Sequence, residues 1–424
     1  MCVREFVAPA TKRPPLERAD HLTENITHRQ IVYRLPPGST AKAGRLAGQA
    51  GACRFVWNEM LARQKVACDA ARVEGEKPPS VTFLSLGKRF AELRREVPWL
   101  SDYAFKVTRY TLKYQADAWK AAFRGSGFPR FHSRHNSTPS FAIPEDVKIR
   151  DGRIHIPRIA WLTIRRRSGS PYPDSKPVKA VIRKSAGKWH VTICYRVETA
   201  GIADNGMAAG VDMNVRQVAV ATSDGQAEII HVPDTGLLDT KIGRVQRRMA
   251  KQKKASRRRF RTRIRLQRLQ RKRANIRKNW HHQASRQIAN RASTVIVEKL
   301  NTKGMTRSAK GTVQNPGTNV RAKSGLNREI LNTGWHSLKQ KLDYKADVTE
   351  INPAYTSQTC NACGTIDKSS RKDRKYQCVA CGHADHADLN AARNILASGI
   401  GATARRGAFA SATPRTRETD ALAA

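Results

Sequence analysis

The sequence predicts a multidomain chain that combines α/β architecture with a small β-barrel. At 424 residues it is longer than a typical single domain, and 39% hydrophobic residues is enough to build more than one core. Apolar residues recur at helical steps over residues 41–125, whereas short alternating runs separated by Pro and Gly occupy residues 126–200. Alternating runs return after residue 210, so the changes of period mark separate domains.

The charge of the chain is strongly unbalanced. It contains 79 Lys and Arg against 34 Asp and Glu, a net charge of +45 at pH 7. Such an excess repels itself in a compact protein unless a polyanion neutralises it, so nucleic acid is the expected partner and an acidic membrane surface is the rival. No run approaches 18 apolar residues, and the first residues lack the apolar core of a signal peptide. We therefore expect a soluble cytoplasmic protein without membrane contact.

The barrel is predicted from short strands. Residues 28–35 alternate apolar and polar side chains, as do several runs between residues 126 and 200, so all of them can share one small barrel interrupted by the helices. Phe128 and Phe131 lie among basic residues and are candidates for stacking on bases. The alternative, that these rings fill the barrel core, stays open.

The next region begins with three predicted strands at residues 210–232 and continues into a basic helical hairpin. Residues 241–278 hold 19 Lys or Arg and no acid, with apolar residues at helical steps and a bend expected at Ala255-Ser256. Like charges one helical turn apart repel each other, which favours phosphate contact over a merely solvated face. The candidate nucleic-acid contacts here are Arg247, Lys251, Lys254, Arg258, Arg261 and Arg265.

Further elements follow in order. An apolar run at 294–297 predicts a buried strand ending at Glu298, and residues 301–327 carry so few core residues that we expect a long mobile loop. A helix at 334–344, a strand at 347–351 and a last helix from Asp388 to Leu396 complete the ordered chain, while residues 1–27 and 401–424 are expected to be disordered tails.

Two CxxC pairs predict a metal site. Cys360, Cys363, Cys378 and Cys381 are each paired on a tight turn with Gly following, and 14 residues separate the pairs. Four thiolates make a closed tetrahedral zinc site without room for water, which is structural and not catalytic. Redox chemistry would need only one pair.

Three carboxylates end or begin predicted elements. Asp212 lies in the first strand after residue 210, Glu298 ends the fourth strand and Asp388 opens the last helix. The predicted elements follow the order of the RNase H fold, which is three strands, a helix, a strand, a helix, a strand and a helix. Carboxylate oxygens in such a fold are suitable ligands for Mg²⁺ or Mn²⁺. Each acid alone could be an ordinary residue at the end of an element, so the surrounding residues decide.

Those surroundings resemble one family. Segments GVDMNV at 210–215, VIVEKLN at 295–301 and ADLNAARNI at 387–395 are similar to the three RuvC motifs of TnpB, the nuclease encoded by insertion sequences. The cysteine cluster lies between the second and third motifs and is preceded by YTSQTC, as in that family. FVWNEM at 55–60, GFPRF at 127–131 and NVRAKSGLN at 319–327 extend the resemblance over about residues 28–400.

The resemblance implies an RNA-guided DNA endonuclease with four parts. They are an oligonucleotide-binding wedge barrel, a helical recognition domain inserted in it, an RNase H-like RuvC domain and a zinc-ribbon insertion, while residues 1–27 extend beyond the usual start of the family. Their expected ranges are 28–40 with 126–200, 41–125, 201–355 with 385–400, and 356–384 for the zinc finger.

By the same resemblance, Asp212, Glu298 and Asp388 would hold two Mg²⁺ ions, and Arg393 would assist at the phosphate. Asp388 is preferred to the nearby Asp385 because it occupies the A-D-x-N-A-A motif. The implied partners are a guide RNA derived from the transposon end and double-stranded target DNA cut beside a short motif, with no obligate protein partner. The alternatives are a compact type V CRISPR effector, a guide-dependent DNA-binding regulator without cleavage, and a transposase that joins strands itself.

Overall fold

The structure is a computed structural model, and the chain in it divides into two compact units, Met1–Gly201 and Ile202–Ala424. The residues it describes are 26–134, 137–165, 175–198 and 204–410. No helix within these ranges is long and apolar enough to cross a membrane. Residues 1–25 and 411–424, which make up most of the predicted tails, lie outside the described residues.

The first unit is built on two antiparallel sheets. One has the strand order β1-β7-β6-β2 and the other the order β3-β4-β5. A bridge between Arg34 and Arg165 joins the end of β1 to the segment that follows β5. The strands are β1 (Ile26–Arg34), β2 (Ser140–Ile143), β3 (Ile149–Arg150), β4 (Arg153–Ile156), β5 (Ala160–Thr163), β6 (Pro177–Ser185) and β7 (Lys188–Glu198).

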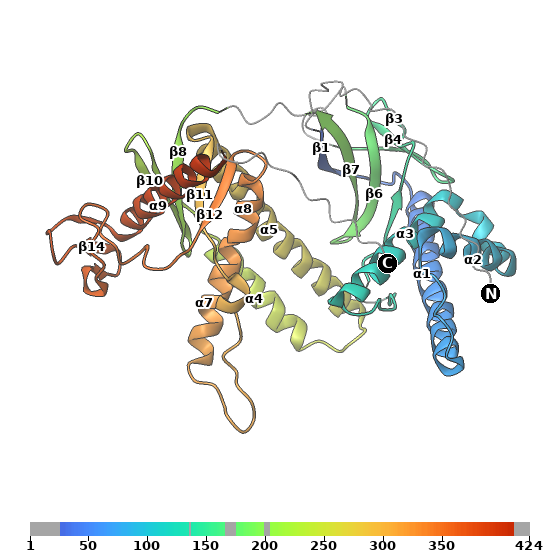
Figure 1. Cartoon of the computed structure of the whole chain (residues 1–424). Coiled ribbons are helices and arrows are strands. Elements are labelled where there is room, and N and C mark those ends of the chain that lie inside the picture. Colours follow the sequence, from blue (N-terminus) through green and yellow to red (C-terminus); the bar gives the residue numbers. More distant parts are fainter. Residues whose placement is uncertain (1–25, 135–136, 166–174, 199–203, 411–424) are drawn as a thin grey trace, which may run out of the picture. The chain divides into compact units, whose positions relative to one another are not determined.

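The helices of this unit all lie between β1 and β2 in the sequence, as an insertion. The first one begins where the Ser39 side chain accepts a hydrogen bond from Lys42 N, and it ends at Gly75, whose φ of +70° favours glycine. Figure 1 shows these helices together beside the strands of the unit. They are α1 (Thr40–Glu74), α2 (Phe83–Glu96), the 3₁₀ turn η1 (Pro98–Asp102), α3 (Phe105–Ala121) and the π-helical turn η2 (Ala122–Ser126).

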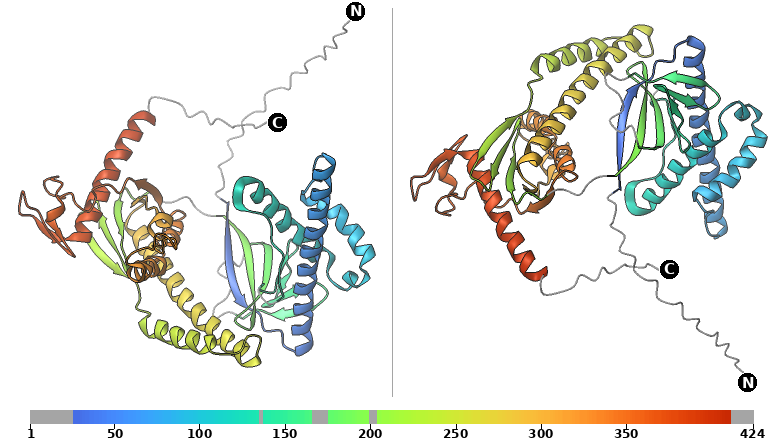
Figure 2. Two further views of the ribbon diagram at one scale, coloured as in Figure 1. Left: turned by 90° about the horizontal axis from the view of Figure 1, so that it is seen from below. Right: turned by 90° about the horizontal axis from the view of Figure 1, so that it is seen from above.

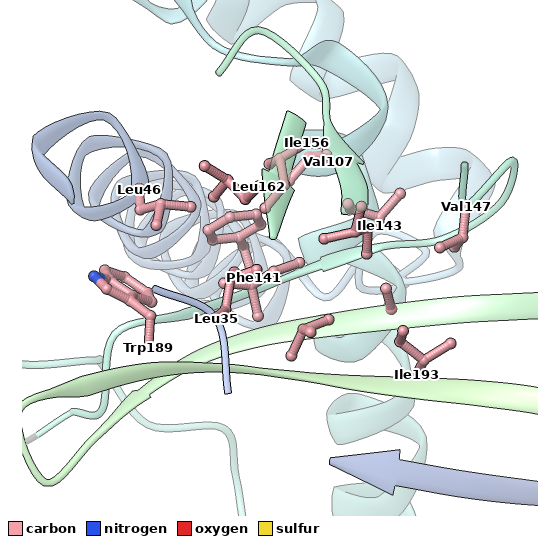
Figure 3. Packing of buried hydrophobic residues seen from close by; sticks show 14 of the residues in the cluster. Leu35, Leu46, Val107, Phe141, Ile143, Val147, Ile156, Leu162, Trp189 and Ile193 are labelled. Carbon is pink, nitrogen blue, oxygen red and sulfur yellow. The ribbon is translucent and has the colours of Figure 1, made fainter. Parts of the chain in front are cut away.

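One hydrophobic core joins the strands to the inserted helices. Figure 3 shows Leu35 after β1, Phe141 on β2 and Trp189 on β7 close to Leu46 of α1 and Val107 of α3. All five are buried. A fully buried side chain of this size contributes roughly 1.5–3 kcal/mol, so the barrel and the insertion stabilise one another.

A five-stranded mixed sheet forms the centre of the second unit. Its strand order is β10-β9-β8-β11-β12. The first three strands are antiparallel, whereas β11 is parallel to both β8 and β12. This is the RNase H-like topology that the sequence predicts. The strands are β8 (Ala208–Met213), β9 (Gln217–Thr222), β10 (Ala227–His231), β11 (Thr294–Glu298) and β12 (Asp347–Ile351).

Helices cover both faces of this sheet. The face of Val211 and Val297 packs against α5 (Arg257–Arg291) and α8 (Trp335–Leu342). The opposite face packs against α9 (Ala387–Ala410), and Figure 2 shows α9 and α5 on opposite sides of the strands. Since α9 runs through residues 401–410, the predicted tail at 401–424 was wrong for that stretch.

The approach of α9 to the sheet depends on glycine. A Cβ atom built on Gly210 of β8 would lie 2.2 Å from Ala392 O and 2.5 Å from Leu396 N. One on Gly399 of α9 would lie 2.4 Å from Ile296 Cγ1. Any side chain larger than hydrogen at these two positions would therefore push α9 away from the strands.

The basic hairpin consists of α4 (Gly236–Ala250) and α5, with its bend where the sequence predicts it. Ala255 has φ of +64°, and the Ser256 side chain caps α5 by accepting from Arg259 N at 3.1 Å. The Arg259 guanidinium donates to the backbone oxygens of Met249 and Gln252 across the bend. This arginine is therefore used to close the hairpin.

The loop predicted at residues 301–327 is partly helical, which corrects that prediction. It contains α6 (Thr302–Met305) and the first half of α7 (Val320–Thr333). Only Ile330 and Thr333 of α7 are buried, and its other side chains are half-buried or exposed, so its sequence lacks the apolar periodicity of a packed helix.

The cysteine segment forms a separate knuckle between β12 and α9. It contains the 3₁₀ turn η3 (Lys368–Ser370) and a small antiparallel sheet of β13 (Arg371–Lys372), β14 (Lys375–Gln377) and β15 (Ala384–His386). Its core consists of Cys360, Tyr376, Cys378 and Ala387. So small a core needs additional support, such as a bound metal.

Candidate functional site

The parallel pairing of β8 and β11 brings two of the three candidate acids together. Val297 pairs with Val211, so Glu298 and Asp212 are the next residues on neighbouring strands. Asp388 is in the first turn of α9, which crosses the same face of the sheet as the Asp212 side chain. Asp212 and Asp388 are both buried, and Glu298 is partly buried.

Each acid has its own hydrogen-bond partners. Asn214 Nδ2 donates to Asp212 Oδ2 at 2.6 Å, and Gln217 Nε2 donates to Asp388 Oδ2 at 2.5 Å. On the other side of Asp388, Arg371 Nη2 lies 3.1 Å from Oδ1. The hydroxyl of Thr356 donates to Glu298 Oε1 at 2.5 Å. The sequence motifs did not indicate Gln217, Arg371 or Thr356 as partners of these acids.

The three acids interact electrically. Burial, followed by repulsion from Glu298 and Asp388, raises the pKa of Asp212 to about 7. Burial also raises the pKa of Glu298, against the hydrogen bond from Thr356. Ionisation of Asp212 and Glu298 is therefore unfavourable without a nearby cation, and carboxylate oxygens of this kind are ligands that Mg²⁺ and Mn²⁺ prefer.

The four cysteines lie together in a geometry that fits zinc. Their Sγ atoms are all within 4.8 Å of one another, with 3.8 Å between Cys360 and Cys381 and 3.6 Å between Cys363 and Cys378. A tetrahedron with Zn–S bonds of about 2.3 Å requires sulfur separations of about 3.8 Å. In the described part of the chain, no other group of three or more His, Cys, Asp or Glu residues brings its ligand atoms so close together. The carboxylate oxygens of Asp212, Glu298 and Asp388 are therefore farther apart than the four sulfur atoms.

Asparagines of the third motif tie the knuckle to α9. Asn390 Nδ2 donates to Thr359 O at 2.8 Å, and its Oδ1 accepts from Asn361 N at 3.0 Å. One turn later, Asn394 Nδ2 donates to the backbone oxygens of Thr356 and Thr359, at 2.9 and 2.7 Å. The segment leading into the first CxxC pair is therefore fixed beside both Glu298 and the start of α9.

Comparisons with known proteins match this arrangement. Three family models align in order: a helix-turn-helix domain of OrfB_IS605 at residues 28–71, the OrfB_IS605 "Probable transposase" at 192–309, and a Cas12f1-like TNB domain at 335–395. In this chain residues 28–71 fold as most of β1 and one continuous helix, α1, and not as two helices joined by a turn.

Full-length relatives extend the match. The chain is 32% identical to "Putative RNA-guided DNA endonuclease InsQ" of Escherichia coli K12, over 87% of this chain and 91% of that one. The chain belongs to the TnpB family. A second relative, from Streptomyces pristinaespiralis, is 25% identical over 89% of this chain and 90% of its own, and has the name "Putative RNA-guided DNA endonuclease".

Relatives among CRISPR proteins share the fold of this TnpB family chain. The Cas12f1 endodeoxyribonuclease of Sulfoacidibacillus thermotolerans is 34% identical over 146 residues, 32% of this chain and 30% of that one. A solved complex of Cas12f1 with sgRNA and target DNA superposes with a TM-score of 0.52 at 16% identity, over 84% of this chain and 82% of that one. At this identity, the likeness concerns the fold alone.

The basic hairpin of this TnpB chain exposes the predicted contact residues. Arg247, Lys251 and Lys254 are exposed near the bend. Between α4 and α5 is a cavity of about 680 Å³ without an acid in its lining. Five arginines line it: Arg244, Arg248, Arg258, Arg261 and Arg265. Arg393, by contrast, forms an ion pair with Asp385, so its guanidinium already has a carboxylate partner.

The predicted stacking residues are exposed on the first unit. Phe128 and Phe131 are 68% and 51% exposed, so they do not fill the barrel core. Their segment is fixed to α1: Trp57 Nε1 donates to Arg130 O at 2.9 Å, and the Trp57 ring stacks on His132 at 4.5 Å. The FVWNEM and GFPRF motifs therefore contact each other, which their separation in the sequence did not reveal.

Proposed function

We propose that this protein is an RNA-guided DNA endonuclease of TnpB type that cuts double-stranded DNA beside a short target-adjacent motif. The observation that carries the proposal is the convergence of Asp212, Glu298 and Asp388 at one end of an RNase H-like sheet, where burial, and then repulsion from Glu298 and Asp388, raises the pKa of Asp212 to about 7. The names of the full-length relatives support the same activity.

Asp212, Glu298 and Asp388 would hold two Mg²⁺ ions. When bound, such ions supply an activated water and stabilise the leaving oxygen of the phosphodiester. The protein's own contribution is orientation, because Asn214 and Gln217 each fix one oxygen of an aspartate. Arg371 balances part of the charge of Asp388.

Guide RNA and its heteroduplex with DNA would lie against the exposed basic surfaces. The arginine-lined cavity between α4 and α5 supports this role, since it has five guanidinium groups and no acid in its lining. Phe128 and Phe131 are placed to stack on exposed bases. Base pairing with the guide would supply the sequence specificity.

The four cysteines would bind one structural zinc ion. Their sulfur separations fit a closed tetrahedral site, and the small core of the knuckle explains why a metal is needed there.

The test is cleavage by the reconstituted complex. Protein copurified with its RNA should cut a matched plasmid in Mg²⁺, while Asp212→Ala should lose cleavage and keep RNA and DNA binding. Asp224→Ala, which removes an exposed acid from the turn after β9, serves as the control and should cut normally. Persistent cutting by Asp212→Ala would reject the assignment.

The copurified RNA and the cleavage assay together distinguish a TnpB nuclease from a CRISPR effector and from a regulator. A transcript of the transposon end supports TnpB activity, whereas a repeat-spacer RNA supports a CRISPR effector. Target binding by the wild-type complex without any cleavage would identify a regulator.

A further inference from the structure

The three-residue turn between β8 and β9 is flanked by amide side chains that contact two of the proposed metal ligands. Asp212 is the second-last residue of β8, and Gln217 is the first of β9. Asn214, which begins the turn, hydrogen-bonds to Asp212, while Gln217, which follows it, hydrogen-bonds to Asp388 on α9. Two carboxylates from different elements therefore receive their amide donors from the two ends of one turn.

The backbone of this turn has an unusual conformation. Arg216 has φ of +65°, in the left-handed region that residues other than glycine seldom adopt. Such a conformation persists when surrounding contacts determine it, and is a reason to look for a role.

Contacts from α7 and α8 fix the turn. Arg216 N donates to Thr333 Oγ1 at 3.0 Å, and Arg216 Nε donates to Glu329 Oε2 at 2.7 Å. Trp335 Nε1 donates to Asn214 O at 2.9 Å. Two further backbone groups of the turn are bonded, since Asn214 N donates to Gln217 O and Arg216 O accepts from Val232 N.

We propose that the β8–β9 turn is a positioning device for the metal ligands, in which Asn214 and Gln217 orient the carboxylates of Asp212 and Asp388, and Thr333 holds the turn in place. The inference rests on the proposed function, because it assumes that these acids bind divalent cations. Hydrogen-bonded partners that orient ligands change metal affinity or activity by about 10–100-fold when removed. Each amide is bonded to a single carboxylate oxygen, Oδ2 in both cases, so it restricts the rotation of that carboxylate.

The experiment measures metal binding directly. Mn²⁺ is titrated into the full-length, zinc-loaded protein without RNA, and free Mn²⁺ is followed by electron paramagnetic resonance, with Asp212→Ala as the reference for other binding sites. We expect Gln217→Leu and Asn214→Ala to weaken Mn²⁺ binding about 10–100-fold. The Mg²⁺ concentration at half-maximal cleavage by the RNA complex should rise in parallel. Gln226→Leu is the matched control, because that glutamine is exposed in the next turn.

A second pair of variants acts on the turn from a distance. Thr333 is buried and touches neither carboxylate, so Thr333→Val removes the acceptor of Arg216 N at constant size and Thr333→Ser keeps it. We expect Thr333→Ser to bind Mn²⁺ with the affinity of the wild type. The Mn²⁺ affinity of Thr333→Val should lie between that of the wild type and that of Gln217→Leu. This comparison decides the question if an amide variant melts at a lower temperature than wild type.

The outcomes separate the two proposals. Unchanged Mn²⁺ affinity in both amide variants, with binding lost in Asp212→Ala, overturns the positioning role and leaves the nuclease site intact. If Asp212→Ala instead bound Mn²⁺ and cut DNA as well as the wild type does, the nuclease site itself would be rejected.

Discussion

The buried carboxyl group of Asp212 makes the stability of the protein depend on pH. Burial, and then repulsion by Glu298 and Asp388, raises its pKa from 3.8 to about 7. An acid whose pKa is higher in the folded protein than in the unfolded chain binds more protons when folded over the interval between the two values. The free energy of unfolding should therefore decrease as pH rises from about 4 to about 7, and then level off.

Asp212→Asn removes this ionisation and keeps the size of the side chain. One pKa unit corresponds to about 1.4 kcal/mol, so the two units between pH 5 and pH 7 correspond to about 3 kcal/mol. Relative to wild type, the variant should therefore gain about 3 kcal/mol more unfolding free energy at pH 8 than at pH 5. Because the Asp212 side chain is buried, solvent screens its charge only weakly, and the value of about 3 kcal/mol needs little reduction. For a unit of roughly 200 residues, the difference is about 6–12 °C in Tm.

Differential scanning calorimetry of the full-length zinc-loaded protein, without added Mg²⁺, measures this difference. Asp224→Asn is the control, because the hydrogen bond from Thr222 lowers the pKa of Asp224. Ionised Asp224 already makes its full contribution to the free energy of unfolding at pH 5. Asp224→Asn should therefore change that free energy by the same amount at pH 5 and at pH 8. An effect of Asp212→Asn that is equal at the two pH values would refute the electrostatic account of the site.

Three other perturbations test the packing, the metal and the charge. Gly210→Ala should cost about 3 kcal/mol in urea unfolding, because its Cβ would lie 2.2 Å from Ala392 O, whereas Gly243→Ala, with nothing within 4 Å, should gain about 0.5–1 kcal/mol; equal effects would contradict the close contact of α9. Cys378→Ser should lose the bound zinc, measured by atomic absorption, and make the knuckle sensitive to protease, and retained zinc would contradict the site. Changing Arg258, Arg261 and Arg265 together to Gln should reduce, by about 2–3, the slope of the logarithm of RNA affinity against the logarithm of salt concentration. Filter binding at several salt concentrations measures this slope, and an unchanged slope would exclude phosphate contact by these arginines.

The sequence predicts much of the architecture because period and punctuation are local signals. The five strands of the second unit, the hairpin bend at Ala255-Ser256 and the paired cysteines all follow from residues close together in the chain. Helix α7 was missed because its stability comes from contacts outside the helix. Glu329 bonds to Arg216, and Asn327 donates to the backbone oxygen of Thr306.

The candidate acids could be found from motifs, but their surroundings could not. Gln217 contacts Asp388 from a strand 171 residues earlier in the chain, and Arg371 contacts it from the knuckle. Nothing in the local sequence of either residue indicates that contact. The burial that raises the pKa of Asp212 is likewise a property of the folded sheet and α9 together. Partners that depend on tertiary packing therefore require the structure.

Hydrogen bonds join the knuckle to the proposed active site, so the cysteine cluster has a consequence beyond its own stability. Thr356, four residues before the first cysteine, contacts Glu298 through its hydroxyl and Asn394 through its backbone oxygen. Arg371, between the two cysteine pairs, contacts Asp388. Loss of zinc would free both connections while leaving the glycine-dependent packing of α9 on β8 in place. Activity should therefore be lost when zinc is removed under conditions that leave the sheet folded, because the proposed zinc ion would hold the surroundings of two acids and not the fold that carries them.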